Sequence, residues 1–172
     1  MRRIILCVFT IIFTNFFSQS KRDNDYKKLI DSALILKAND TYRFYNKELE
    51  REEKADNWKI YLHNFKKKIN NIYIIDENHL PVNLENVKTD IPLKTIDIEN
   101  PKNRSVIKKG LDAWKIIPIL SENELKINII AFKVTYKHKL LQFSNGGGST
   151  IIFQYSCEEK KWKLIKEKHK GI

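Results

Sequence analysis

The sequence predicts an α+β protein in which an N-terminal helix, or helices, pack on a C-terminal four-stranded antiparallel meander. Two observations indicate this fold class. Apolar residues recur at the helical period of 3.6 in the first half of the chain, and four β-rich runs joined by short turns fill the last third. The region between them contains three prolines and many Asn and Asp residues, so it is expected to be mostly loop.

Residues 1–20 have the order of regions that is typical of a cleavable secretory signal. A positive start at Arg2 and Arg3 is followed by an apolar run of 14 residues from Ile4 to Phe17, and then by small residues at Ser18 and Ser20. A helix of 14 residues spans about 21 Å, which is less than the ~30 Å hydrocarbon core of a bilayer. We therefore expect export, to the periplasm or as a secreted protein, with residues 21–172 forming a single α+β domain.

The helices are predicted from apolar spacing. A first helix is expected from about Asn24 to Ala38, because its apolar residues form one stripe after the capping side chains at 23–25. The charged segment 40–57 is expected to hold a second helical piece with a solvated face. Another helix is expected from about Asn57 to Asn70, and a short β-like run follows at Ile72–Ile75.

Four strands are predicted in the last third of the chain, over residues 114–120, 125–136, 150–157 and 162–166. The glycines at 146–148 are expected to form a flexible connection between the second and third strands. Pro118 cannot donate a ladder hydrogen bond, so the first strand is expected at one edge of the sheet. The lysines of the last strand, which resist strand addition by other chains, predict the other edge.

Alternation along the strands assigns the two faces of the sheet. The face expected to lie under the first helix carries Ile130, Phe132, Val134, Tyr136, Ile151, Phe153, Tyr155, Cys157, Trp162 and Leu164. The opposite face carries Ile117, Ile119, Ile129, Ile152 and Ile165. Either residues 57–100 cover this opposite face as a second layer, or it is an exposed contact patch. The candidate partner surface consists of Ile117, Ile129, Ile152, Lys161 and Lys163.

A helix against a curved antiparallel meander is similar in outline to the cystatin-like and NTF2-like folds. The resemblance concerns the arrangement of elements alone. Such scaffolds host inhibitors, ligand pockets and enzymes alike, so the resemblance implies a fold outline and no particular activity.

Charge gives a weak indication of the partner. The full chain has a formal net charge of +11, and removal of Arg2 and Arg3 with the signal leaves 30 basic and 21 acidic residues. An exported basic protein is expected to meet an acidic protein or an anionic envelope surface rather than nucleic acid. Trp162 alternates with Lys161 and Lys163, which predicts an inward ring and argues against an exposed stacking platform for bases.

No combination of residues in the sequence indicates a catalytic, cofactor or metal site. The four histidines, His63, His79, His138 and His169, are dispersed, and Cys157 is the single cysteine after the signal. Cys157 is in phase with the expected core face, where burial would suppress its reactivity.

The sequence therefore favours an exported, non-enzymatic binding protein, such as a protein-interaction, inhibitor or immunity-type module. Two alternatives stay open. One is a small-molecule pocket protein or small hydrolase with an NTF2-like outline. The other is a basic protein that lies on anionic lipid or glycan, which predicts that lysines converge on one face.

Overall fold

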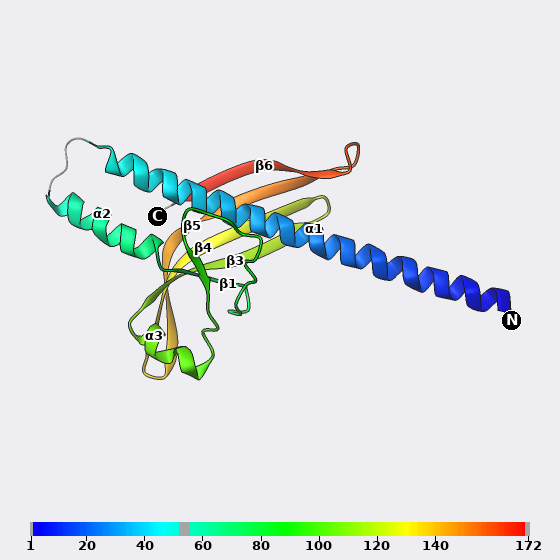
Figure 1. Cartoon of the computed structure of the whole chain (residues 1–172), viewed down its shortest axis with the longest axis horizontal. Helices are drawn as coiled ribbons and strands as arrows, with labels where there is room; N and C mark the ends of the chain where they lie inside the picture. Colours follow the sequence, from blue (N-terminus) through cyan, green and yellow to red (C-terminus); the bar gives the residue numbers. More distant parts are fainter. Residues whose placement is uncertain (1, 52–55, 171–172) are drawn as a thin grey trace.

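A computed structural model describes the backbone of residues 2–51 and 56–170, and the side chains of residues 25–51 and 56–170. The helices are α1 (Arg2–Leu49), α2 (Asp56–Ile69), the 3-10 turn η1 (Pro101–Asn103) and α3 (Arg104–Lys108) (Figure 1). The strands are β1 (Ile72–Ile75), β2 (Leu93–Thr95), β3 (Leu111–Ser121), β4 (Glu124–Lys137), β5 (Leu140–Ser156) and β6 (Lys161–Lys170). The predicted signal at residues 1–20 lies outside the described side chains. Across the described residues, no helix combines the length and apolarity needed to cross a membrane.

The six strands form one sheet in the order β2-β1-β3-β4-β5-β6. Strands β3 to β6 are the predicted antiparallel meander, but β1 pairs in parallel with both β2 and β3, so the sheet is mixed and has two more strands than expected. The α+β prediction is confirmed at this coarser level. The pairing of β1 depends on where α2 returns the chain to the sheet, which local sequence patterns do not encode.

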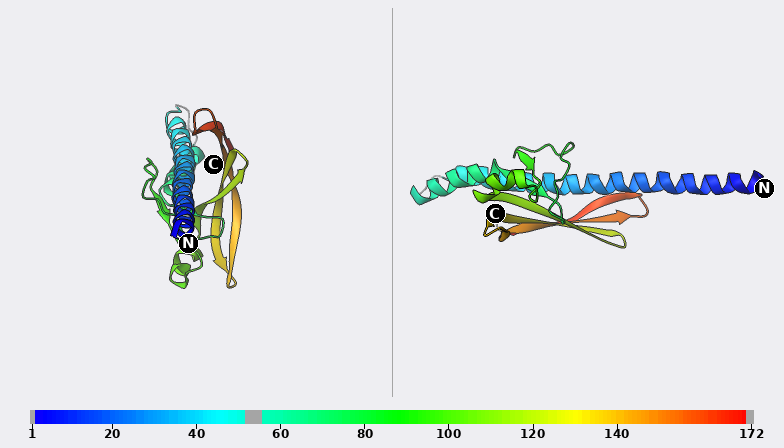
Figure 2. Two further views of the ribbon diagram at one scale, coloured as in Figure 1. Left: turned by 90° about the vertical axis from the view of Figure 1, so that its right-hand side faces the viewer. Right: turned by 90° about the horizontal axis from the view of Figure 1, so that it is seen from below.

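Helix α1 is longer than predicted and runs without a break to Leu49. The polar residues near position 40 do not end it, because Ala38, Thr41 and Tyr45 continue the buried stripe at helical spacing. The Thr41 hydroxyl donates to the Lys37 carbonyl at 2.9 Å within the helix. Ala33, Leu34 and Ala38 are fully buried against the sheet. Figure 2 shows the resulting two layers, with α1 lying along one side of the strands.

The face of β4 that packs under α1 is the opposite of the one predicted. Leu125, Ile127 and Ile129 are fully buried in the helix-facing core together with Ile151 of β5. The predicted core residue Ile130 projects from the other face, because it pairs with Gly148 and not with the inward residues of β5. The assignment of β4 is therefore wrong by one position, whereas Ile151 and Phe153 were assigned correctly.

A second core covers one end of the other face of the sheet. Its buried members are Ile75, Ile96, Ile98, Ile107, Leu111, Ala113 and Val134. The sheet twists so that this end turns toward α3 (Figures 1 and 2). The predicted covering layer of residues 57–100 is present only in part, because a segment around residues 96–107 covers this end and leaves the end near Ile117 and Ile152 open. Whether the open end is a contact patch stays a prediction.

Two sequence signals had a different structural meaning from the one expected. Pro118 is not on an edge strand, because β3 lies between β1 and β4. Its missing N–H removes no hydrogen bond to β1, since β1 pairs only with residues 112–115 of β3. The glycines at 146–148 lie within β5 and form a bulge, with Gly147 at φ +102°. A Cβ at Gly148 would lie 2.7 Å from the Ile129 carbonyl oxygen, so glycine lets the two strands approach.

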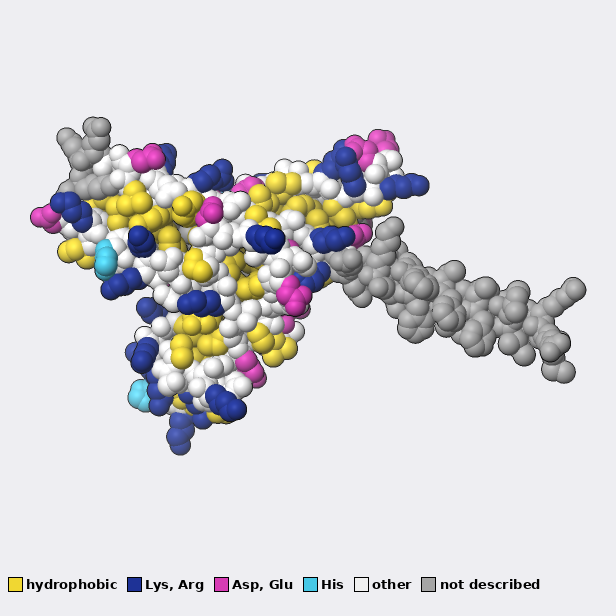
Figure 3. Space-filling view, viewed as in Figure 1, with side chains coloured by type: hydrophobic (Ala, Val, Ile, Leu, Met, Phe, Trp, Pro, Cys, Tyr) yellow, Lys and Arg dark blue, Asp and Glu magenta, His cyan; other side chains and the backbone are white. Residues whose placement is uncertain are grey.

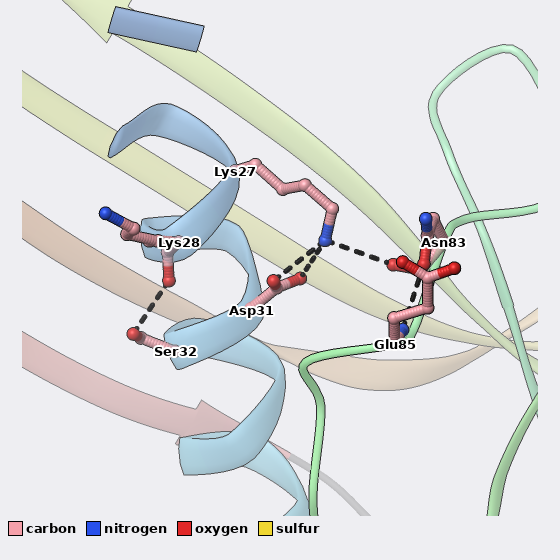
Figure 4. Close-up of polar contacts among 6 residues, drawn as sticks. All are labelled: Lys27, Lys28, Asp31, Ser32, Asn83 and Glu85. Atoms are coloured by element: carbon pink, nitrogen blue, oxygen red, sulfur yellow. Dashed lines mark hydrogen bonds and ion pairs between the residues drawn. The ribbon is translucent and has the colours of Figure 1, made fainter. Parts of the chain in front are cut away.

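The long loop after β1 is tied to α1 by a lysine (Figure 4). Lys27 Nζ donates to Asp31 Oδ2 at 2.8 Å and to the Asn83 carbonyl oxygen at 3.3 Å. Asp31 is buried, so the Lys27 charge compensates a carboxylate that has lost most of its water. In the loop, the Glu85 amide donates to Asn83 Oδ1 at 2.9 Å and holds the turn.

Replacement of Gly148 by alanine is expected to lower the free energy of unfolding by about 2 kcal/mol, because the new Cβ would push β5 away from Ile129. Urea denaturation measures this change. The matched control is Gly146→Ala, whose Cβ would meet its nearest neighbour at 3.6 Å and should shift stability by less than about 0.5 kcal/mol. Equal losses in the two variants would contradict the close approach at Gly148.

Candidate functional site: a lysine face of the sheet

All five lysines of β6 project from the face of the sheet that is turned away from α1. Side chains of directly paired residues share a face. Each lysine of β6 pairs with one of five alternate residues of β5. The pairs are Lys161 with Ser156, Lys163 with Gln154, Lys166 with Ile152, Lys168 with Thr150, and Lys170 with Gly148. The intervening residues of β5 include Ile151 and Phe153, which are buried under α1.

A bulge in β6 is what places these lysines together. Strict alternation would put Lys161 and Lys163 on one face and the following three lysines on the other. The register shifts between Ile152 and Phe153, so that Ile165 is the extra residue and Lys166 returns to the same face as Lys163. We call the surface formed by these five lysines, Lys126, Ile117, Ile119, Ile130 and Ile152 the lysine face.

The centre of the lysine face is a shallow hollow of about 550 Å³. Four lysines line it, namely Lys126, Lys166, Lys168 and Lys170, together with Asn128, Ile130, Asn145, Gly147, Gly148, Ser149, Thr150 and Ile152. No carboxylate is among the described residues that line this hollow. Gly147 and Gly148 have no side chains, which leaves space at the bottom of the hollow. Thr150 Oγ1 donates a hydrogen bond to Asn128 Oδ1 at 2.9 Å across this space.

Charge on the lysine face is compensated only at one end. Glu159, in the turn before β6, contacts Lys161 at 2.7 Å and also Lys163. Hydrogen bonds from these two lysines lower the pKa of Glu159. Within residues 25–51 and 56–170, no carboxylate forms an ion pair with the four lysines around the hollow. The hollow is therefore the most cationic part of the lysine face.

The structure brings together four of the five predicted partner-surface residues. Ile117 and Ile152 are half-buried on the lysine face, and Lys161 and Lys163 lie at its compensated end. The fifth, Ile129, is fully buried under α1 and cannot contact a partner, which corrects the prediction. The sequence did not indicate Lys126, because its face depends on the register between β4 and β5.

A polar cluster that the sequence did not indicate lies on the other side of the same strands. His169 Nδ1 is 2.6 Å from Ser149 Oγ and 3.6 Å from Asp40 Oδ2 of α1, and His169 Nε2 is 2.6 Å from Glu167 Oε1. These contacts tie the edge strand β6 to β5 and α1. In the sequence His169 is one of four dispersed histidines, and only the pairing of β6 with β5 places it here.

The residue types of this cluster are those of a Ser-His-carboxylate hydrolase site. His169 Nδ1 faces the Ser149 hydroxyl and Nε2 faces the Glu167 carboxylate, which is the order of groups found around the histidine of such a site. However, Ser149 is only 5% exposed and lies on the face covered by α1, so its hydroxyl is closed to a substrate. In this conformation the contacts of His169 with Ser149, Glu167 and Asp40 have a structural role, because they hold β6 against β5 and α1, and we call these four residues the clasp.

A second histidine, His79, lies at the junction of the lysine face and the second core. Its Nε2 is 3.0 Å from Lys115 Nζ, and its ring stacks on Phe143 at 4.8 Å between centroids. Burial of the ring, and then the positive charge of Lys115, lower the pKa of His79 against the opposing effect of Glu99 and Asp76. The neutral ring accepts a hydrogen bond from the Lys115 ammonium group.

Other candidate groups do not form a chemical centre. Cys157 is a free and exposed thiol in the turn after β5, so the prediction that it is in the core is wrong. The alternation of β5 does not continue into this turn. Across the described side chains, no group of three His, Cys, Asp or Glu residues is arranged to hold a metal ion.

No family model, curated protein or solved structure matches this chain. The similarity in outline to the cystatin-like and NTF2-like folds is therefore not supported by a matching solved structure. Function has to be argued from the surfaces of the molecule itself.

The low pKa of His79 predicts a dependence of stability on pH. Because the unfolded histidine binds a proton at about pH 6.5 and the folded one only at lower pH, the free energy of unfolding should fall as pH drops below about 6.5 toward the folded-state pKa. His79→Asn should flatten this part of the profile, since asparagine tolerates the positive φ of 67°. The control His138→Asn replaces another histidine at a positive φ and reports the effect of the substitution itself.

A double-mutant cycle tests the clasp. Ser149→Ala and His169→Gln should each destabilise the protein by about 1 kcal/mol, and the pair should lose less than the sum because one hydrogen bond is shared. Thr150→Ala with His169→Gln should be additive, because Thr150 projects from the other face. Additive losses for the Ser149 pair, measured by urea denaturation, would show that the clasp does not couple.

Proposed function

We propose that this chain is an exported, non-enzymatic binding protein that docks an acidic protein surface on the lysine face. The observation that carries the proposal is the convergence of six lysines, five from β6 and Lys126 from β4, on one open sheet face. Such a face creates a positive potential that steers an acidic partner and fixes its orientation.

Apolar side chains among the lysines favour a protein partner. Ile117, Ile130 and Ile152 are half-buried, and Ile119 is 47% exposed. A docked protein would remove these side chains from water, at about 25 cal/mol for each Å² of apolar area buried.

Two features support a binding role over strand addition or catalysis. Lysines along the edge strand β6 disfavour its pairing with a strand from another chain, so the partner meets the face and not the edge. The Ser149–His169–Glu167 cluster keeps its serine buried, so we assign it no catalytic step. Export rests on the sequence of residues 1–20.

The test compares capture of envelope proteins by the purified protein with capture by a Lys166→Gln, Lys168→Gln, Lys170→Gln triple variant. A specific partner should be captured by the native protein and lost with the variant. It should also be lost at about 1 M NaCl, where the Debye length is about 3 Å. The matched control replaces Lys28, Lys47 and Lys88, three exposed lysines outside the lysine face, with glutamine and should retain the partner.

Flotation with vesicles separates the lipid alternative. The protein should stay unbound with vesicles of anionic phospholipid as well as with neutral ones. Flotation that requires anionic lipid and disappears in the triple variant would overturn the acidic-protein proposal and identify the lysine face as a membrane surface. Identical captured proteins for the native protein and the triple variant would also overturn it.

A further inference from the structure

A second hollow lies on the helix side of the molecule, between α2 and α3. It measures about 870 Å³, which is within the range of roughly 300–1,000 Å³ of small-molecule sites. It forms where the sheet twists from the face covered by α1 to the face covered by α3. In Figure 3, Lys and Arg side chains gather around the indentation between these two helices. We call this hollow the cleft.

Lysines from three separate elements converge on the cleft. Lys67 and Lys68 come from α2, Lys109 follows α3, and Lys133 comes from β4. The one carboxylate among the described lining residues is Asp112, which is 4.0 Å from Lys68. The lining therefore has a net charge of about +3, and an anion inside it would relieve the repulsion between the ammonium groups.

Glycine at position 110 leaves the space in which Lys133 lies. Gly110 has φ +82°, and a Cβ there would lie 2.9 Å from Lys133 Cε. The lysine side chain consequently runs over the glycine along the wall of the cleft. Its position is set by the backbone of the turn that leads from α3 into β3.

The opposite wall of the cleft is aromatic. Tyr61 and Phe65 of α2 lie parallel at 6.0 Å between ring centroids with an interplanar angle of 3°. Trp114 and Phe132 of the sheet also line the hollow. Phe65 and Trp114 are buried, so the apolar contact area open to a ligand comes from Tyr61, which is 38% exposed, and from half-buried Phe132.

A further cation lies behind this aromatic wall. Lys37 of α1 is 2% exposed, and its Nζ lies 5.6 Å from the centre of the Trp114 ring. Burial lowers the pKa of Lys37, Asp40 opposes the shift, and the positive charge of Lys68 adds to it. Lys37 and Lys68 therefore repel each other, and a bound anion near Lys68 would reduce this cost.

From these features we infer that the cleft binds a small organic anion with a flat apolar body, such as an aryl carboxylate. The carboxylate lies among Lys67, Lys68, Lys109 and Lys133, and the ring lies against the accessible parts of Tyr61 and Phe132. The four lysines of the cleft are different from those of the lysine face, so this inference stands or falls independently of the proposed function.

Calorimetric titration of the purified protein with 2-naphthoate tests the inference. Saturable 1:1 binding is expected, at least tenfold tighter than that of the uncharged 2-naphthylmethanol. Lys67→Gln and Lys133→Gln should each weaken naphthoate binding by about tenfold, because each removes a charge-assisted hydrogen bond. The control Lys168→Gln, on the lysine face, should bind naphthoate as the native protein does.

Amide chemical shifts of the native protein provide a second measurement that needs no variant. Naphthoate should shift amides of α2, of the turn around Gly110 and of β4 near Lys133. Equal affinity for the neutral alcohol, an equal loss in Lys168→Gln, or shifts confined to other parts of the chain would each overturn the inference. Absence of saturable binding at millimolar naphthoate would do the same.

Discussion

The close packing of α1 on the central strands is the contact on which the rest of the structure depends. Ala33 and Ala38 are small, so the helix backbone comes near the sheet while Leu34 fills the space between them. The isoleucines beneath, Ile127 and Ile129 among them, have no water contact. Since this contact makes the central part of one face of β4 and β5 dry, the lysines that pair with the alternate residues of β5 project from the other face.

Two bulges, one in β5 and one in β6, then determine on which face of the sheet the lysine side chains lie. The glycine bulge in β5 lets β4 approach at Gly148 and clears the floor of the lysine face. The bulge at Ile165 in β6 moves three lysines onto the same face as Lys161 and Lys163. One inserted residue in an edge strand thus converts a strand with lysines on both sides into a strand with a cationic face and a polar clasp behind it.

The twist of the sheet gives the molecule two cationic regions of different shape. The lysine face is broad and mixed with isoleucines, which suits a macromolecular surface. The cleft is concave and has aromatic rings beside its lysines, which suits a small anion. A net charge of +11 for the chain is therefore not spread evenly, and part of it is concentrated where strands from distant parts of the sequence meet.

The sequence by itself determined the α+β class, the α2 helix and the four strands of the meander, because each depends on local periodicity and β-propensity. It also indicated that Trp162 points inward and that β6 is an edge. Tertiary structure alone decided the parallel pairing of β1, the inward face of β4 and the burial of Ile129. It also placed His169 beside Ser149 and grouped the lysines. These features depend on register between strands far apart in the chain, and a shift of one residue reverses which face a side chain occupies.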